Sequence, residues 1–374
     1  MTDATENDGM THASASPEQQ EFGRSWRRPL AHLADRMRTA ARSALNEALQ
    51  QPELSDFATP TGRGVGDWTF ALDDGPEAVL SEWLEECARE APLSLLTEDA
   101  GWRHRGPGPR AGTTVELDGF DHGGARIAVD PVDGTRNLMF DLRPAWSVLS
   151  FAGPGPNEPR FADLSAGMVS EIPASGARSY RRLWAVRGAG CERERYELSD
   201  DASAGVAAPD NCVHSGQALH VDADDRPDNG YFSFFTYDSQ LRPTVARVAA
   251  SFFARLEKHE GAQLSSCYDD QYISSGGQLA LLSQGSYRFV ADLRSTTGEW
   301  HGRSTQVAKP YDMAGAALCA MEAGAIVESV DGSALDIPID ATTPVDFIAF
   351  ANPATRARLR PHFDASLVEI AESF

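Results

Sequence analysis

The chain has 374 residues, a hydrophobic fraction of 41% and a formal net charge of −22 at pH 7. This length suffices for two domains with a substantial core, and so acidic a surface excludes a nucleic-acid polymer as the expected partner. No apolar run reaches the roughly 18 residues of a membrane span, and no secretory signal pattern opens the chain. Five scattered cysteines suit a reducing compartment, so the sequence predicts a cytoplasmic protein without a membrane partner.

Hydrophobic spacing predicts helices and a short strand after a polar tail. Residues 1–22 are polar and poor in apolar side chains, so we expect a disordered tail. Residues 25–50 repeat apolar side chains at helical spacing, and a loop over residues 52–66 follows. Residues 69–74 then predict a strand, and residues 77–88 return to helical spacing.

The middle of the chain predicts a sheet and then a domain boundary. Residues 103–112 are rich in Gly, Pro and Arg and predict a surface excursion. Strands are predicted over residues 146–151, 166–169 and 183–186. The polar segment 197–230 marks the boundary between an N-terminal α+β domain of residues 23–205 and a C-terminal α/β domain of residues 206–374.

Helices and strands alternate beyond this boundary. Helices are predicted near residues 242–257 and 276–284. Strands are predicted near residues 287–291, 325–328 and 346–350. Alternation of this kind is typical of an α/β fold.

The most informative segment is Asp-Pro-Val-Asp-Gly-Thr at residues 130–135. The preceding residues 124–129 predict a strand, so Asp130 would end that strand and the loop after it would present acids from a rigid frame. Oxygen ligands presented in this way suit a hard divalent cation. Ordinary turn chemistry explains the same short pattern about equally well.

Two further acidic segments bear on this choice. Glu98 and Asp99 follow an apolar run, where a solvated turn is the simpler explanation. Asp312 precedes a helical pattern over residues 313–323 that Gly324 closes, so Asp312 is predicted as an N-cap. The three segments in this order favour one shared site over three coincidences.

With these motifs the chain resembles the inositol monophosphatase-like family of metal-dependent phosphatases, whose superfamily includes fructose-bisphosphatases and bisphosphate nucleotidases. The resemblance covers roughly residues 30–360 and rests on Thr97-Glu98-Asp99, on the segment from Asp130 to Asn137, and on the segment from Tyr311 to Gly315 that continues to Ala325. The departures from the family motifs are Thr97, Asp99, Tyr311 and Ala325, and none removes a ligand oxygen. The resemblance implies a two-domain layered αβαβα sandwich with metals between the domains.

The resemblance also implies a metal site. Its ligands would be Glu98, Asp130, the Val132 carbonyl, Asp133 and Asp312, with Asp133 bridging two ions. Two or three Mg²⁺ ions are implied, with Mn²⁺ as a substitute.

By the same resemblance, Thr135 would orient the attacking water with Asp73 behind it, although the adjacent Asp74 is equally able from sequence alone. Glu98 would be catalytic as well as a ligand. The backbone N–H groups of Gly134 and Thr135 would hold a phosphate oxygen. A hydroxyl that only caps the next turn is the plain alternative for Thr135.

Two further residues are predicted to select the substrate. Glu322 matches a family position that meets substrate hydroxyls, and an exposed helix acid is its plain alternative. Lys309 is one of two lysines in the chain and could reach a second anionic group, and a surface residue before a proline is its plain alternative.

The implied function is Mg²⁺-dependent hydrolysis of a small phosphate monoester, a phosphorylated polyol or sugar such as inositol monophosphate. The alternatives are a phosphatase for a nucleotide 3′-phosphate or histidinol phosphate, and a catalytically inactive homologue that binds phosphorylated metabolites. Family members are often dimers, so the resemblance also implies a homodimer.

Overall fold

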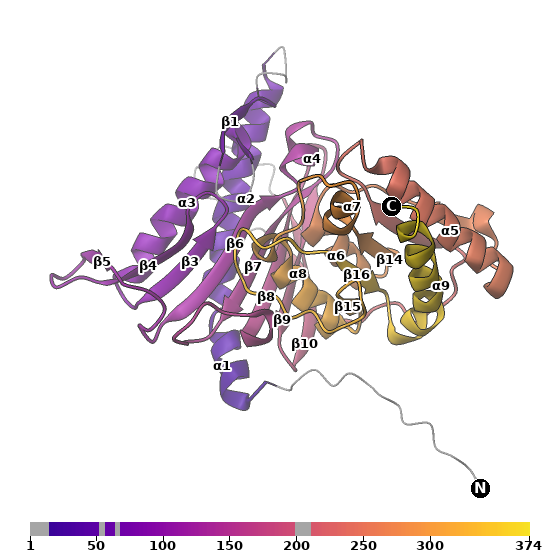
Figure 1. Cartoon of the computed structure of the whole chain (residues 1–374). Coiled ribbons are helices and arrows are strands. Elements are labelled where there is room, and N and C mark those ends of the chain that lie inside the picture. The colour runs from indigo at the N-terminus through magenta and orange to yellow at the C-terminus, as the bar shows by residue number, and fades with distance from the viewer. Residues whose placement is uncertain (1–14, 52–56, 64–67, 199–210) are drawn as a thin grey trace, which may run out of the picture.

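The structure is a computed structural model that describes residues 15–51, 57–63, 68–198 and 211–374. It contains five alternating layers of helices and strands (Figure 1). Helices α2 (Arg27–Leu49) and α3 (Ala71–Ala88) cover the outer face of a nine-stranded sheet. Helices α6 (Ser275–Ser283) and α8 (Pro310–Ala323) lie between this sheet and a five-stranded one, and α5 (Arg242–Glu260) and α9 (Pro353–Ala371) cover the far side. The predicted αβαβα sandwich is confirmed.

The nine-stranded sheet has the order β11-β10-β9-β8-β7-β6-β3-β4-β5. All its neighbours are antiparallel except β3 and β6, which are parallel. Its strands are β3 (Leu93–Thr97), β4 (Gly101–Pro107), β5 (Thr114–Glu116), β6 (Ala125–Asp133), β7 (Ala145–Ala152), β8 (Leu164–Ile172), β9 (Ser179–Val186), β10 (Gly190–Glu197) and β11 (Asn211–Leu219).

The five-stranded sheet has the order β13-β12-β14-β16-β15. Its strands are β12 (Gly230–Phe235), β13 (Cys267–Asp269), β14 (Tyr287–Asp292), β15 (Ile326–Glu328) and β16 (Phe347–Phe350). The remaining described elements are a hairpin, three short α-helices and the two 3-10 helices η1 (Phe161–Asp163) and η2 (Leu264–Ser266). The hairpin strands and the α-helices are β1 (Pro60–Arg63), β2 (Trp68–Phe70), α1 (Pro17–Ser25), α4 (Thr135–Met139) and α7 (Arg294–Trp300).

The N-terminal tail prediction is wrong for residues 17–22, which lie in helix α1. Ser16 begins this helix by accepting a hydrogen bond from the Gln19 N–H at 3.2 Å. The Phe22 ring then packs on Phe151 of the large sheet, with 5.4 Å between the ring centroids. Residues 1–14 of the predicted tail lie outside the described residues.

Three other local predictions are wrong in part. Strand β2 ends at Phe70, so residues 71–74 are helical, because the Asp73 carboxylate accepts the Phe70 N–H at 3.0 Å and caps α3. The predicted surface excursion 103–112 does lie at intermediate or exposed positions except for Gly106, and it contains most of β4, which pairs along β3 and then with β5. The predicted loop 52–66 contains strand β1 at residues 60–63, which pairs with β2, and its residues 52–56 and 64–66 lie outside the described residues. The other predicted helices and strands are found within a few residues of their predicted bounds.

The two sheets divide the chain later than the predicted boundary between residues 205 and 206. Strand β11 still belongs to the nine-stranded sheet, and β12 is the first strand of the other sheet. The change of sheet therefore falls between Leu219 and Gly230. No helix in the described part of the chain is long and apolar enough to cross a bilayer.

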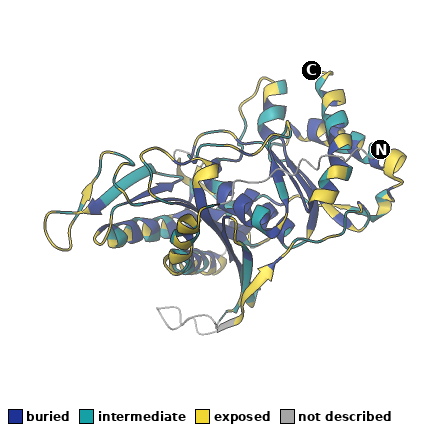
Figure 2. Cartoon of the chain, turned by 90° about the horizontal axis from the view of Figure 1, so that it is seen from below, coloured by how far each residue is buried: buried dark blue, intermediate teal, exposed yellow. Residues whose placement is uncertain are grey.

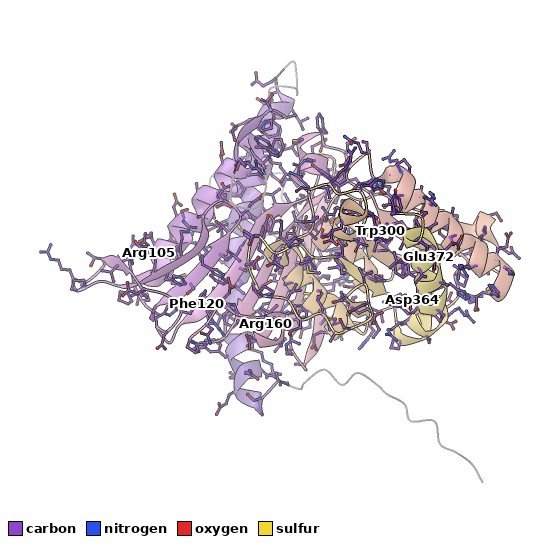
Figure 3. The ribbon with its side chains drawn as sticks, viewed as in Figure 1. Arg105, Phe120, Arg160, Trp300, Asp364 and Glu372 are labelled. Carbon is purple, nitrogen blue, oxygen red and sulfur yellow. The ribbon has the colours of Figure 1, made fainter. Side chains whose placement is uncertain are left out.

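Helix α8 packs in the centre of the sandwich and is apolar almost all round, as a fully buried helix must be. Figure 2 shows this central region as mostly buried, with exposed residues on the outer helices and on β5. At the rim, Arg160 lies where the two halves meet (Figure 3) and its Nε donates to Asp336 at 2.8 Å. The two sheets are thus joined by an apolar centre and by polar contacts at its edge.

Gly315 allows α8 to approach the large sheet closely. A Cβ built at this position would lie 2.2 Å from the Leu149 carbonyl oxygen of β7, and a Cβ at Gly167 of β8 would lie 2.4 Å from the Gly315 oxygen. Backbone atoms cannot yield as a flexible side chain can. Gly315 therefore fixes the position of α8, which carries Asp312 one turn earlier.

Gly315→Ala should destabilise the protein by about 1–3 kcal/mol, because the added methyl group forces α8 away from β7. Urea denaturation followed by circular dichroism measures the change. Gly176→Ala is the matched control, since a Cβ there would meet nothing within 4 Å. Equal stability of the two variants would show that the approach of α8 is not constrained by this glycine.

Candidate active site

A cavity of about 480 Å³ opens between the two halves where several elements end or begin. The predicted acids Glu98, Asp130, Asp133 and Asp312 all line it. Glu98 follows β3, Asp130 and Asp133 end β6, and Asp312 is in the first turn of α8. The fold therefore brings together acids that are more than 200 positions apart in the sequence.

Asp130 is buried at the end of β6, where its Oδ1 atom accepts the Val132 N–H at 2.9 Å. The pairing of β6 with β7 is irregular between Asp130 and Asp133, which turns both acids toward the cavity. Burial raises the pKa of Asp130 well above its usual range, and the neighbouring negative charge of Asp133 raises it further.

Asp133 is held from the opposite half of the sandwich. Its Oδ2 atom accepts hydrogen bonds from the Ser274 hydroxyl and the Gly276 N–H, each at 2.7 Å, at the start of α6. Burial raises the pKa of Asp133 to about 6, and these hydrogen bonds oppose that increase. Asp133 is thus a contact between β6 and α6 as well as a cavity acid.

Asp312 is the third residue of α8, so the prediction that it is the N-cap is wrong. The N-cap is Lys309, and the Asp312 Oδ2 atom reaches back to accept the Lys309 N–H at 3.0 Å. Its Oδ1 atom is buried and has no hydrogen-bond partner in the part of the chain that the structure describes. Burial raises the pKa of Asp312 well above its usual range, with the charge of Asp133 as the next cause.

Thr135 lines the cavity, and its side chain contacts Asp73. The Thr135 hydroxyl is 3.0 Å from Asp73 Oδ1 and 2.8 Å from the Val132 carbonyl oxygen, so both are acceptors for its proton. Burial raises the pKa of Asp73 to about 7. Asp74, the alternative from sequence, is exposed, so Asp73 is the early acid that contacts Thr135.

Gly134 separates the acids from helix α4. Its φ of 98° is in the left-handed region, and a Cβ there would meet the Ile273 carbonyl oxygen at 3.1 Å. Glycine therefore allows β6 to turn sharply into α4 beside the loop before α6. Gly134 and Thr135 both line the cavity, and the role of their backbone N–H groups in holding a phosphate oxygen stays a prediction.

The two residues predicted to select the substrate have different positions. Lys309 lines the cavity, and its Nζ donates to the Thr342 carbonyl oxygen at 2.8 Å. Glu322 is not a lining residue, because it lies near the far end of α8. Its carboxylate accepts the N–H groups of Gly188 and Gly190 at 2.7 and 2.9 Å, so the prediction that it meets the substrate is wrong.

The lining residues that the sequence did not predict include Trp68, Arg136 and Arg294. The Arg136 guanidinium lies over the rings of Phe70 and Tyr237, 5.1 Å from each centroid. Their only sequence signal is that Trp68 and Arg136 adjoin predicted site segments. Nothing near Arg294 in the sequence marks it.

Arg294 is the buried positive charge beside the acids. It forms an ion pair with Asp292 at 2.6 Å, and its Nη2 atom also donates to the Ser275 hydroxyl at 3.1 Å. Its charge lowers the pKa values of Asp133 and Asp312, against the effect of burial. One guanidinium that already has a carboxylate partner does not balance the remaining acids.

These residues suit a hard divalent cation. All the donor atoms are oxygens, which are the ligands that such a cation prefers. Burial and mutual repulsion disfavour the ionised forms of Asp130 and Asp312, so a bound cation would stabilise them. The buried Asp312 Oδ1 atom has no hydrogen-bond partner among the described residues. Across the described ranges, no three His, Cys, Asp or Glu side chains already form a ready-made metal site. Glu98, Asp130, Asp133 and Asp312 are the residues that could hold such an ion.

No protein-family model and no curated protein matches the sequence. Solved structures do match. The inositol monophosphatase of Thermotoga maritima superposes with a TM-score of 0.56 at 15% identity, over 91% of this chain and 99% of its own. The extragenic suppressor protein SuhB of Bartonella henselae gives a TM-score of 0.55 at 15% identity, over 90% of this chain and 98% of its own.

A Pyrococcus horikoshii protein described as having similarities to inositol-1 monophosphatase gives a TM-score of 0.51 at 15% identity, over 94% of this chain and 99% of its own. Each of these matches covers at least 90% of this chain. The expected resemblance is confirmed at the level of the fold: the chain has the inositol monophosphatase fold.

Proposed function

We propose that the protein is a metal-dependent phosphatase that hydrolyses a small phosphate monoester. The observation that carries this proposal is the convergence of Asp130, Asp133 and Asp312 on one cavity that Thr135, in contact with Asp73, also lines. The shared fold supports it. Divalent cations bound there would supply positive charge to the phosphoryl group and acidify a bound water.

The residues of the chain have separate tasks in this proposal. Asp73 accepts a hydrogen bond from the Thr135 hydroxyl. The lone pairs of that hydroxyl are then free to accept a hydrogen bond from a water in the cavity. A pKa of about 7 lets Asp73 take up a proton near neutral pH. Thr135 therefore orients the attacking water, and Asp73 acts through Thr135.

The substrate that we propose is a phosphorylated polyol or sugar such as inositol monophosphate. The cavity of about 480 Å³ suits a ligand of this size, and its lining is rich in hydroxyl and charged groups. Lys309 and Arg136 would contact the substrate away from the acids. We also propose that the protein works in the cytoplasm as a homodimer.

One feature favours a second candidate substrate, a nucleotide 3′-phosphate. Trp68 is 46% exposed at the cavity, and Tyr237 lines it as well. Aromatic rings in this position could stack on a base. Faster phosphate release from 3′-AMP than from inositol monophosphate, measured with the same enzyme, would select this candidate.

Asp130→Asn should lower kcat by orders of magnitude, because it removes a charge from the metal site with little change of shape. Phosphate release from a panel of phosphate esters with Mg²⁺ or Mn²⁺, and with chelator, measures this loss. Asp118→Asn, at an exposed loop position away from the cavity, is the control. Activity of Asp130→Asn within threefold of the parent would remove Asp130 from the site. No release from any ester by the parent would favour the inactive homologue.

Thr135→Ala should lower kcat by roughly 10²–10⁴-fold with a smaller change in KM, because the hydroxyl positions water and does not hold the substrate. Thr135→Ser should recover much of the rate, since it keeps the hydroxyl. Steady-state kinetics of the three proteins gives the comparison. If the Ala variant is as active as the parent, the hydroxyl only stabilises the turn before α4 through Asp73 and the Val132 carbonyl.

Mg²⁺ should raise the melting temperature, because a cation relieves repulsion among the cavity acids. Binding to the folded form alone stabilises by about 2.7 kcal/mol at a hundredfold excess over Kd. Differential scanning fluorimetry measures the shift, with NaCl at matched ionic strength as the control for general screening. The shift should be lost in Asp133→Asn. A Mg²⁺ shift no larger than the NaCl shift would mean that these acids do not form one metal site.

A further inference from the structure

A second cavity, of about 500 Å³, lies on the large sheet away from the acids. It is lined by side chains of β8 to β11 and by the end of α6. The lining residues are Glu171, Ser179, Arg181, Arg193, Arg195, His214, Gln217 and Gln284. Glu171 is the one carboxylate among them, although acids outnumber Lys and Arg by 55 to 33 in the chain.

Strand β10 produces this reversal of charge by alternation. Its residues 192–195 read Glu-Arg-Glu-Arg, and successive side chains of a strand point to opposite faces. Glu192 and Glu194 face the helices and contact Arg27 at 2.7 and 2.9 Å. Arg193 and Arg195 therefore point to the other face, into the second cavity.

The arginines of this cavity are brought together against their mutual repulsion. Arg195 of β10 is directly opposite Arg181 of β9 and directly opposite His214 of β11. Like charges opposite each other destabilise a sheet. Glu171 neutralises Arg181, whose Nε and Nη2 atoms donate to its carboxylate at 2.9 and 3.0 Å. It is the one carboxylate in a cavity that three arginines line.

Arg193 and Arg195 have neutral partners instead of acids. Arg193 donates to the Gln217 side chain at 3.1 Å, and Arg195 donates to the Ser179 hydroxyl at 3.3 Å. Neither forms an ion pair with a carboxylate in the described ranges. The Cα atoms of alternate residues lie about 7 Å apart along a strand, and a guanidinium group matches phosphate oxygens in geometry.

We propose that this second cavity binds a small anion with two phosphoryl groups, such as a diphosphate or a bisphosphate ester. Arg193 and Arg195 contact the phosphoryl oxygens, and Arg181 is held in place by Glu171 and by the Trp146 ring 5.8 Å away. Gln217, Gln284 and Ser179 supply neutral hydrogen bonds. The proposal does not depend on phosphatase activity, because no residue of this cavity lines the first one.

The probe is inorganic diphosphate, added to the full chain in excess chelator so that no metal recruits it to the acidic cavity. Diphosphate should raise the melting temperature at least about 2 °C more than NaCl of equal ionic strength. Monophosphate should give a smaller shift, since it reaches one guanidinium at a time. No shift beyond that of NaCl would overturn the proposal.

Arg193→Gln/Arg195→Gln tests the assignment to this cavity. The double variant should lose the diphosphate shift and, without anion, should melt at the same or a higher temperature than the parent, because the repulsion is removed. Arg89→Gln/Arg110→Gln removes two exposed arginines elsewhere and should keep the shift. A shift retained by the first variant, or a lower melting temperature for it without anion, would overturn the proposal. If the double variant fails to fold, Arg193→Gln alone should still reduce the shift.

Discussion

Several buried carboxyl groups meet at one cavity, and the central part of this structure depends on how their charges are stabilised. Asp130 and Asp133 are buried, and burial disfavours their ionised forms. The fold opposes this penalty with Arg294 and with the hydrogen bonds that α6 donates to Asp133. These contacts cross between the two sheets, so the same interactions that stabilise the acids also join the two halves of the molecule.

Helices α6 and α8 both begin at this cavity, and this shared orientation has a physical benefit. A helix N-terminus carries partial positive charge and N–H groups without intrahelical partners, which stabilise nearby anions. Helix α6 begins beside Asp133, and α8 begins beside Asp312. Their positions are fixed by apolar packing, including the close approach of Gly315 to β7, so the backbone and not the flexible side chains sets the spacing of the acids.

Local sequence predicts the part of the site that is encoded locally. The turn after β6 needs glycine at Gly134 for its positive φ, and the acids on either side of Pro131 are fixed by that turn, so residues 130–135 are informative on their own. Glu322 shows the limit of this reasoning. It is ten residues after Asp312, and ten residues of helix extend about 15 Å, so a shared helix does not imply a shared site. Arg294 and Trp68 reach the cavity only through tertiary packing, which no short pattern reports.

The two cavities of this acidic molecule carry charges of opposite sign. In the first, acids gather where their repulsion calls for a cation. In the second, the strict alternation of β10 sends Glu192 and Glu194 to Arg27 and leaves Arg193 and Arg195 on the far face of the sheet. The charges of β10 balance along the sequence, but in the folded strand the acids lie on one face of the sheet and the arginines on the other. The sign of the charge in each cavity, and not the net charge of the protein, determines which ions bind there. The reason is that salt screens charges that lie more than about 10 Å away.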